Sequence, residues 1–311
     1  MKHEPGFRGE TPEQTGHKVE KISVSEEEAY KILIPKHRES AIQLDDFEGV
    51  VGPEEIERDK EAIKKKKSGM EDVDSASHRR AQLLEALLTE QIELSDWFGD
   101  NVMTIIPSEY DDLFNGIDLA VEFEKEGFFQ YLAMGIDVTS GPGSVAKKFS
   151  IIRNHIRDET LTNMKYFHSE RSDIKGRKGS IPQLVIGADA RTISELATLW
   201  LDAQRPRMLN KEATQAELEE LREKAKDAQK KLSRHRARVL ILQQIKDQLE
   251  VYIDFATRNK KGEAEEKYKK LLPIVSELLA KAELSHQEVL ENEVDDVYRA
   301  IKQSLATFAI E

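Results

Sequence analysis

The chain has 311 residues, of which 34% are charged and only 6% are aromatic, so we expect long solvated helices around a modest packed core. The formal net charge of -12 excludes a protein that binds nucleic acid with its whole surface, and any such contact would have to be local. No cysteine is present, which excludes a disulfide scaffold, a thiolate zinc site and a cysteine nucleophile. With neither a signal peptide nor a run of about 18 apolar residues, the sequence predicts a cytoplasmic protein without membrane contact.

Residues 1–70 are polar and are interrupted by Gly and Pro. Their last third contains the charged run EEIERDKEAIKKKKSG, which is typical of a solvated helix or linker. We expect this N-terminal segment to be largely disordered, with at most a short docking piece.

Residues 71–208 carry the hydrophobic periodicities of an α/β (α+β) domain with a small mixed central sheet flanked by helices. The expected elements, in chain order, are a helix over 78–98, strands over 101–107, 117–124 and 130–139, a helix over 144–159, strands over 163–169 and 181–187, and a helix over 192–203. This order reads as a helix–three strands–helix–strand core followed by a further helix.

The second and third strands predict a hairpin with a tight turn at Gly127-Phe128, since a type II′ turn favours Gly at its first central position. Residues whose numbers sum to 255 would then face each other, and Asp118 would lie opposite Asp137, about 5 Å away at Cβ. The alternation supports this register, because the other face is a continuous apolar layer made by Leu119, Val121, Phe123, Leu132, Met134 and Ile136.

Two interpretations tolerate like charges in this position. The pair lies at a solvated strand end and caps turns, or it holds a divalent cation, since hard cations take carboxylate oxygens. In the first helix Glu90 shares the apolar stripe and favours the second interpretation, whereas Glu85 and Glu93 are expected to point away. In the helix over 144–159, Lys148 flanks the apolar face, and Lys147 is expected to point away.

These residues resemble the PD-(D/E)xK phosphodiesterase superfamily, the fold of restriction-type nucleases. The resemblance covers roughly residues 78–205. It matches Asp118 in GIDLAVEF to the acid that opens the second strand and Asp137 in GIDVT to the acid that ends the third. It also assigns Glu90 to the acid that the first helix often supplies.

The sequence departs from the superfamily pattern at Thr139, where the motif lysine is expected. Some members carry this lysine on the following helix, where Lys148 or Lys147 would replace it. The resemblance implies metal-dependent hydrolysis of phosphodiester bonds with Lys148 as a catalytic residue. It further implies Mg²⁺ or Mn²⁺ as cofactor, held by Glu90, Asp118 and Asp137, with the backbone carbonyl of Val138 completing the site. If neither lysine reaches the site, the domain would resemble an inactive relative.

Nucleic acid, and DNA in the first instance, is the expected partner. The polar stretch 170–180 would contact its phosphates through Arg171, Lys175, Arg177 and Lys178, unless this stretch is only a solvated loop.

Residues 209–311 are expected to form a separate helical region. Apolar positions alternate 3 and 4 apart from Leu218 to Ala256, a heptad pattern that predicts one long helix and a coiled-coil hairpin closed by a third helix. The long helix would dimerise, bind a partner protein, clamp DNA beside the catalytic domain, or fold back on its neighbour. The alternative function is therefore a catalytically inactive nuclease-like scaffold that works as an interaction module through this coiled coil.

Overall fold

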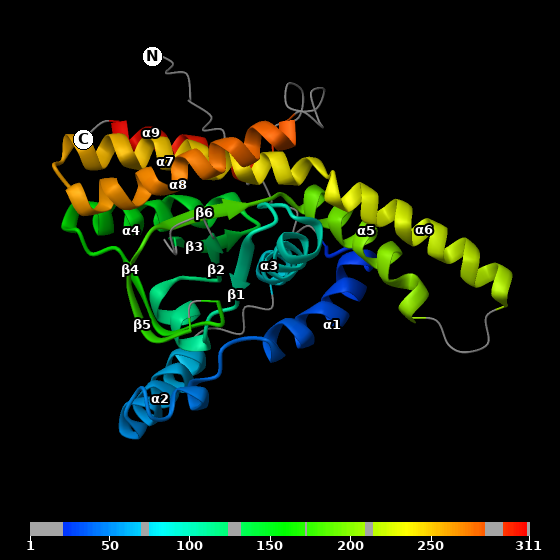
Figure 1. Ribbon diagram of the computed structural model, residues 1–311, viewed down its shortest axis with the longest axis horizontal. Helices are drawn as coiled ribbons and strands as arrows, with labels where there is room; N and C mark the ends of the chain where they lie inside the picture. The colour runs from blue at the N-terminus through cyan, green and yellow to red at the C-terminus, as the bar shows by residue number, and fades with distance from the viewer. Residues whose placement is uncertain are drawn as a thin grey trace, which may run out of the picture.

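The computed structural model describes residues 21–69, 75–123, 132–171, 173–208, 214–283 and 295–309. Within them the chain is a mixed α+β protein with a small mixed sheet flanked by helices (Figure 1), which confirms the expected fold class at this level. In the described part of the chain, no helix combines the length and apolarity that crossing a membrane requires.

The central sheet has four strands in the order β1 (Val102–Ile105), β2 (Leu119–Phe123), β3 (Leu132–Thr139) and β6 (Gln183–Gly187). The first three pair antiparallel, and β6 runs parallel to β3. Leu119 faces Ile136 and Val121 faces Met134, so the predicted register is confirmed. The predicted turn at Gly127-Phe128 lies outside the described residues.

A second sheet contains only β4 (Thr162–Ser169) and β5 (Ile174–Ile181), which pair antiparallel. The sequence analysis predicted a loop where β5 begins, and this was wrong. Most positions of β5 are open to solvent and its sequence, IKGRKGSI, has no apolar alternation. Residues 174–181 therefore form a strand because their backbone pairs with that of β4, and the side-chain pattern alone does not predict this pairing.

Helices surround the central sheet. On one side α3 (Ala76–Ser95) contacts β1 and β3 and is itself covered by α1 (Val24–Glu39) and α5 (Ala190–Met208). Around β6 the sheet is contacted by α4 (Val145–Asp158), α7 (Arg236–Arg258) and α9 (Asp296–Ala306). As a result α3 is enclosed between the sheet and other helices.

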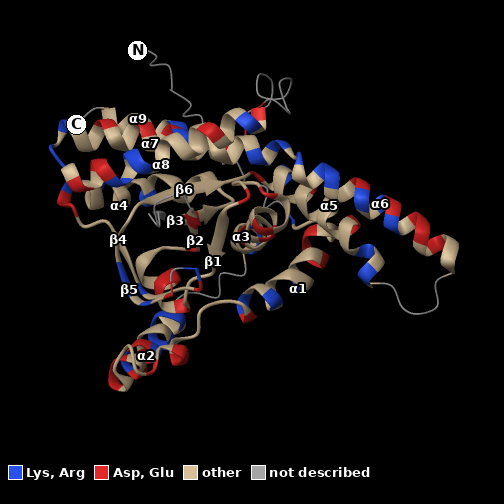
Figure 2. Cartoon of the chain, in the orientation of Figure 1, with Lys and Arg blue, Asp and Glu red and all other residues tan. Residues whose placement is uncertain are grey.

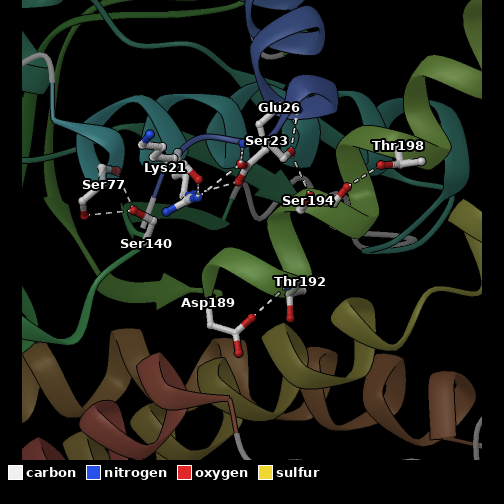
Figure 3. Close-up of polar contacts among 10 residues, drawn as sticks. Lys21, Ser23, Glu26, Ser77, Ser140, Asp189, Thr192, Ser194 and Thr198 are labelled. Atoms are coloured by element: carbon white, nitrogen blue, oxygen red, sulfur yellow. Dashed lines mark hydrogen bonds and ion pairs between the residues drawn. The ribbon is translucent and has the colours of Figure 1, made fainter. Parts of the chain in front are cut away.

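The N-terminal segment was expected to be largely disordered, and for residues 21–69 this was wrong. They form α1, the turn η1 (Leu44–Phe47) and α2 (Pro53–Gly69). Ser23 caps the start of α1, and its hydroxyl oxygen lies 3.0 Å from that of Ser194 on α5 (Figure 3). Glu26, in the first turn of α1, forms a buried ion pair with Arg80 of α3 at 2.7 Å. The charged run that was predicted as a solvated helix or linker lies in α2, whereas α1 was not expected because the helices it packs on, α3 and α5, lie far away in the sequence.

The long C-terminal helix is interrupted, which corrects the heptad prediction. Helix α6 (Gln215–Ser233) ends, and His235 caps the start of α7 by accepting a hydrogen bond from the Ala237 N–H at 3.2 Å. Helix α6 packs on α5, and α7 packs on α8 (Gly262–Glu283). Figure 1 shows the α5–α6 pair projecting from the body of the protein. A dimer or partner contact through α6 stays a prediction.

Residues 214–309 do not form a core of their own. One contiguous set of buried apolar residues runs from α1 through the sheet to α9, so the expected boundary near residue 208 does not divide the packing. A polar link is made at β6, the edge of the sheet. Gln248 bonds to the N–H and C=O of Val185, and Gln244 bonds to those of Gly187, all at 2.6–2.9 Å. Two amide side chains of α7 thus pair the free backbone edge that β6 would otherwise bury unsatisfied.

We therefore predict that Gln244→Ala destabilises the fold by about 2 kcal/mol or more, because both backbone groups of buried Gly187 lose their partners. Urea unfolding of the full chain followed by circular dichroism measures this change. The matched control is Gln243→Ala on the same helix, whose side-chain amide donates to Asp247 one turn along the helix, and it should cost less than about 0.5 kcal/mol. Equal losses in the two variants would contradict the edge-pairing role.

Candidate active site

The two predicted acids meet where β2 begins and β3 ends. The Asp118 N–H donates to the Ile136 carbonyl at 2.8 Å, and the Val138 N–H donates to Asp118 Oδ2 at 2.6 Å. These bonds extend the β2–β3 ladder by one residue and hold the Asp118 carboxylate against β3. There it lies within hydrogen-bonding reach of the Asp137 carboxyl.

Lys148 reaches the same place from the first turn of α4. Its ammonium forms an ion pair with Asp137 Oδ1 and donates to the Val138 carbonyl at 3.0 Å, and 22% of its side chain is exposed. Lys147 is fully exposed on the same turn. Of the two lysines considered from the sequence, Lys148 is therefore the one that the structure brings to the acids.

Thr139, which stands at the expected lysine position, builds the turn that begins α4. Its hydroxyl donates to the Gly141 carbonyl at 3.1 Å and contacts the Ser144 hydroxyl at 2.8 Å. The following residue, Ser140, donates to the Ser77 carbonyl at 2.5 Å and so ties this turn to the start of α3 (Figure 3). The residue that departs from the motif thus helps to place the helix that carries Lys148.

The helix carboxylate at the site is Glu85, whereas Glu90 was predicted. Glu90 instead accepts a hydrogen bond from the indole N–H of Trp200 on α5. Glu85 was expected to point away, and this was wrong: its carboxyl is affected electrostatically by both Asp118 and Lys148. The helical-wheel argument failed because α3 is buried on two sides, so that its most apolar stripe is not the face that meets the site.

The turn before β2, η2 (Asp111–Asn115), contributes two acids with different roles. Asp111 is fully buried and accepts from the backbone N–H groups of Lys165 and Tyr166 at 2.6 and 3.0 Å, so it anchors the turn to β4. Asp112 lies at the open rim of the site, and the Asp118 carboxyl is close enough to raise its pKa. Asp112 therefore belongs to the acidic cluster, which we define as Glu85, Asp112, Asp118 and Asp137.

Burial and mutual repulsion perturb this acidic cluster. Burial, and then the Asp118 charge, raise the pKa of Asp137 to about 7, and the nearby Lys148 ammonium only partly offsets them. The same two causes raise the pKa of Glu85 well above its usual value. Crowding by protein atoms and the charges of Asp118 and Glu85 also raise the pKa of Asp112. Because the Asp112 side chain is open to solvent, we attribute the rise in its pKa mainly to the neighbouring charges. One lysine thus faces more negative charge than it can balance.

This donor set suits a hard divalent cation such as Mg²⁺ or Mn²⁺, which takes carboxylate and carbonyl oxygens. The uncompensated charge of the acidic cluster is what such a cation would relieve. Among the described residues, no three His, Asp or Glu side chains are already gathered in the arrangement of a metal site. Binding would therefore require the carboxylates to rotate, beginning with Asp137, one oxygen of which is occupied by Lys148.

The sequence analysis missed His37, near the end of α1. Its Nε2 lies 2.8 Å from Glu85 Oε1, and only 10% of its side chain is exposed. Burial, followed by the charge of Arg38, lowers the pKa of His37 to about 4, so the imidazole is neutral at pH 7. The sequence offered no signal for this contact, because α1 was not expected to pack on the domain.

The basic residues predicted to grip phosphates lie on and before β5. Arg171 donates to the Asn101 carbonyl at 3.1 Å, and Arg177 pairs with Glu55 of α2. Lys175 and Lys178 lie over the rings of Phe47 and Phe167, at 5.3 and 5.6 Å. Figure 2 shows basic residues along the ribbon of β5 and residues of both charge signs on neighbouring α2.

Comparison of the chain with protein-family models, curated proteins and solved structures found no match.

Without divalent cations, we predict that Asp137→Asn becomes progressively more stable than the wild type as pH rises from 5 to 8. The folded-state pKa lies above the ordinary value of 3.8, so folded Asp137 retains a proton that the unfolded chain has released. The contribution of the Asp137 carboxyl to wild-type stability therefore falls as the pH rises from about 4 to about 7, and it stays at that lower level at higher pH. Between pH 5 and pH 8, the unfolding free energy of Asp137→Asn should rise relative to that of the wild type by on the order of 2 kcal/mol.

Chemical denaturation in EDTA at pH 5, 6.5 and 8 measures this shift. Asp46→Asn, at an exposed position on η1, is the control and should show no such dependence. A pH-independent difference for Asp137→Asn would show that the Asp137 carboxyl titrates normally.

Proposed function

We propose that this protein is a metal-dependent phosphodiesterase of the PD-(D/E)xK type that hydrolyses nucleic acid. The observation that carries the proposal is the meeting of Asp118, Asp137 and Lys148 from the start of β2, β3 and α4, with Glu85 of α3 near enough for its pKa to respond to the charges of Asp118 and Lys148. The order of these elements, a helix, three strands, a helix and, after β4–β5, a strand parallel to β3, supports it as well. In this proposal Glu85 takes the role first assigned to Glu90.

The proposed reaction is hydrolysis of a phosphodiester bond. Water attacks phosphorus, a new P–O bond forms, and the bond to the leaving sugar oxygen breaks. The attacking water passes a proton to a carboxylate of the acidic cluster, and the leaving oxygen takes a proton from solvent. Lys148 Nζ, held between Asp137 and the Val138 carbonyl, would orient the attacking water or neutralise charge on a phosphate oxygen.

Glu85, Asp118, Asp137 and the Val138 carbonyl would hold the Mg²⁺ or Mn²⁺ ion. When bound, the ion would lower the pKa of a bound water and neutralise the scissile phosphate. The carboxylates would supply the charge that attracts the ion, and the burial of Asp137 would keep bulk water from screening it.

We predict that Asp118→Asn, Asp137→Asn and Lys148→Met each lower Mg²⁺- or Mn²⁺-dependent cleavage of plasmid and single-stranded DNA by at least about 100-fold. Each substitution removes one group of the site and keeps a similar side-chain size. Gel-based cleavage by the full-length protein measures the loss, with EDTA as the no-metal condition.

Lys147→Met is the matched control for Lys148→Met, since the two lysines are adjacent and Lys147 is exposed. It should cleave at the wild-type rate. Cleavage that survives Asp137→Asn would rule out this centre. A wild-type protein without activity on DNA or RNA would favour the inactive nuclease-like scaffold.

For substrate binding we propose that β5 contacts the phosphate backbone through Lys175 and Lys178, which have no ion-pair partner among the described residues. We predict that Lys175→Ala with Lys178→Ala weakens DNA binding and lowers the slope of log K against log salt by about 1–2. Fluorescence anisotropy with the Asp118→Asn protein, from 50 to 200 mM NaCl, measures both quantities without cleavage.

The control, Lys224→Ala with Lys231→Ala, changes the net charge equally on the α6 arm, where each lysine pairs with an acid one turn away. It should bind with the wild-type salt slope. If the two double variants behave alike, DNA does not contact β5.

A further inference from the structure

Helix α1 contacts the acidic cluster through His37. The contact joins His37 Nε2 to Glu85 Oε1 at 2.8 Å, with 10% and 19% of the two side chains exposed. Residue 37 lies 48 positions before Glu85 and outside the stretch of roughly 78–205 to which the superfamily resemblance extends. A contribution of α1 to the site is therefore additional to the nuclease-like core.

Polar contacts along α1 and α3 hold this imidazole in place. Glu26 pairs with Arg80, the Tyr30 hydroxyl donates to Gln82 Oε1 at 2.6 Å, and His37 contacts Glu85. The residue numbers rise together along the two helices, so the three contacts form one continuous series. Burial of Leu33 and Ile34 in the same core adds apolar packing between these polar contacts. Since Glu26, Tyr30 and the buried Leu33 and Ile34 hold α1 independently of the His37 contact, His37 restrains Glu85 rather than following it.

We propose that His37 is a positioning residue of the active site, which holds the Glu85 carboxylate in the orientation that presents Oε2 to a divalent cation. This inference rests on the proposed phosphodiesterase function. When Glu85 is ionised, the neutral imidazole donates its Nε2–H to Oε1, which fixes the plane of the carboxylate. Groups that orient a metal-binding carboxylate in this way reduce the reorganisation that binding requires. The Glu85 carboxylate would then not have to rotate before it binds the cation, whereas that of Asp137 would.

The test compares His37→Leu, which removes the hydrogen bond, with His37→Gln, whose side-chain amide can donate from nearly the same position as Nε2. Lys36→Ala is the matched control, since Lys36 is exposed on the same helical turn. Calorimetric titration of the full-length protein with Mn²⁺ gives the affinity, and cleavage assays give kcat/KM. Thermal unfolding in EDTA shows whether each variant is folded.

We expect His37→Leu to weaken Mn²⁺ affinity and kcat/KM by about 10–100-fold, and His37→Gln to stay within about threefold of the wild type. A His37→Leu protein that binds Mn²⁺ like the Lys36→Ala control overturns the inference. So does a folded His37→Gln protein that loses as much affinity as His37→Leu, because a hydrogen bond would then not be what matters.

Failure of this inference is distinguishable from failure of the proposed function. If the wild type neither binds Mn²⁺ nor cleaves, the phosphodiesterase proposal itself fails. If it does both and the His37 variants are unchanged, only the positioning role is lost, and the imidazole contributes to packing alone.

Discussion

The pairing of β2 with β3 in a single register is the constraint on which the candidate site depends. Side chains alternate along a strand, so the register decides which residues face the core and which face each other. Val121 and Met134 pair in the buried layer, and the same ladder holds Asp118 against the N–H of Val138. A slip of one residue would turn the core-facing side chains of the strand to the opposite face of the sheet. It would disrupt both the apolar core and the acidic cluster.

The acidic cluster opposes folding, and the surrounding structure has to offset that cost. Buried carboxylates repel one another and lose hydration, and both effects raise the pKa values of Glu85 and Asp137. Lys148 balances part of the charge, and backbone N–H groups bind Asp118 and Asp111. The remainder is offset by the extensive core that α1, α7 and α9 complete around the sheet. The excess negative charge of this cluster is what the cation proposed above would relieve.

Sequence reasoning succeeded where local alternation decides the structure. It predicted the strand register from apolar spacing, and it placed Lys148 nearer than Lys147 to the buried face of α4 while leaving open which lysine approaches the acids. It failed where long-range packing decides. Glu85 faces the site because α3 is enclosed on two sides, and no periodicity within α3 reports which side holds the acids. For the same reason α1, with its His37, was expected to be disordered: its partners, α3 and α5, begin 52 or more residues later.

The heptad pattern is a second case in which the spacing of apolar residues does not reveal the long-range packing. Its apolar spacing continues across Ser233 and His235, yet the chain ends one helix and caps the next there. Spacing records which residues are buried, but it does not record whether they meet one partner or two. Here α6 meets α5, whereas α7 meets α8 and the edge of the sheet, where Gln244 and Gln248 face the β6 backbone. Gln244 and Gln248 lie between the heptad positions, so the heptad pattern carried no signal of that second partner.

In the proposed nuclease, Lys148 on α4 would supply the ammonium group that the superfamily motif places on the third strand, at the position of Thr139. A lysine at position 139 would share a strand face with Asp137, two residues away. Thr139 instead hydrogen-bonds within the turn, and this places the first turn of α4 so that Lys148 approaches Asp137. The electrostatic requirement concerns the location of an ammonium group, and a helix can meet it as well as a strand. The lysine then depends on the geometry of the turn at residues 140–144, so this turn contributes to the site although it contributes no charged side chain.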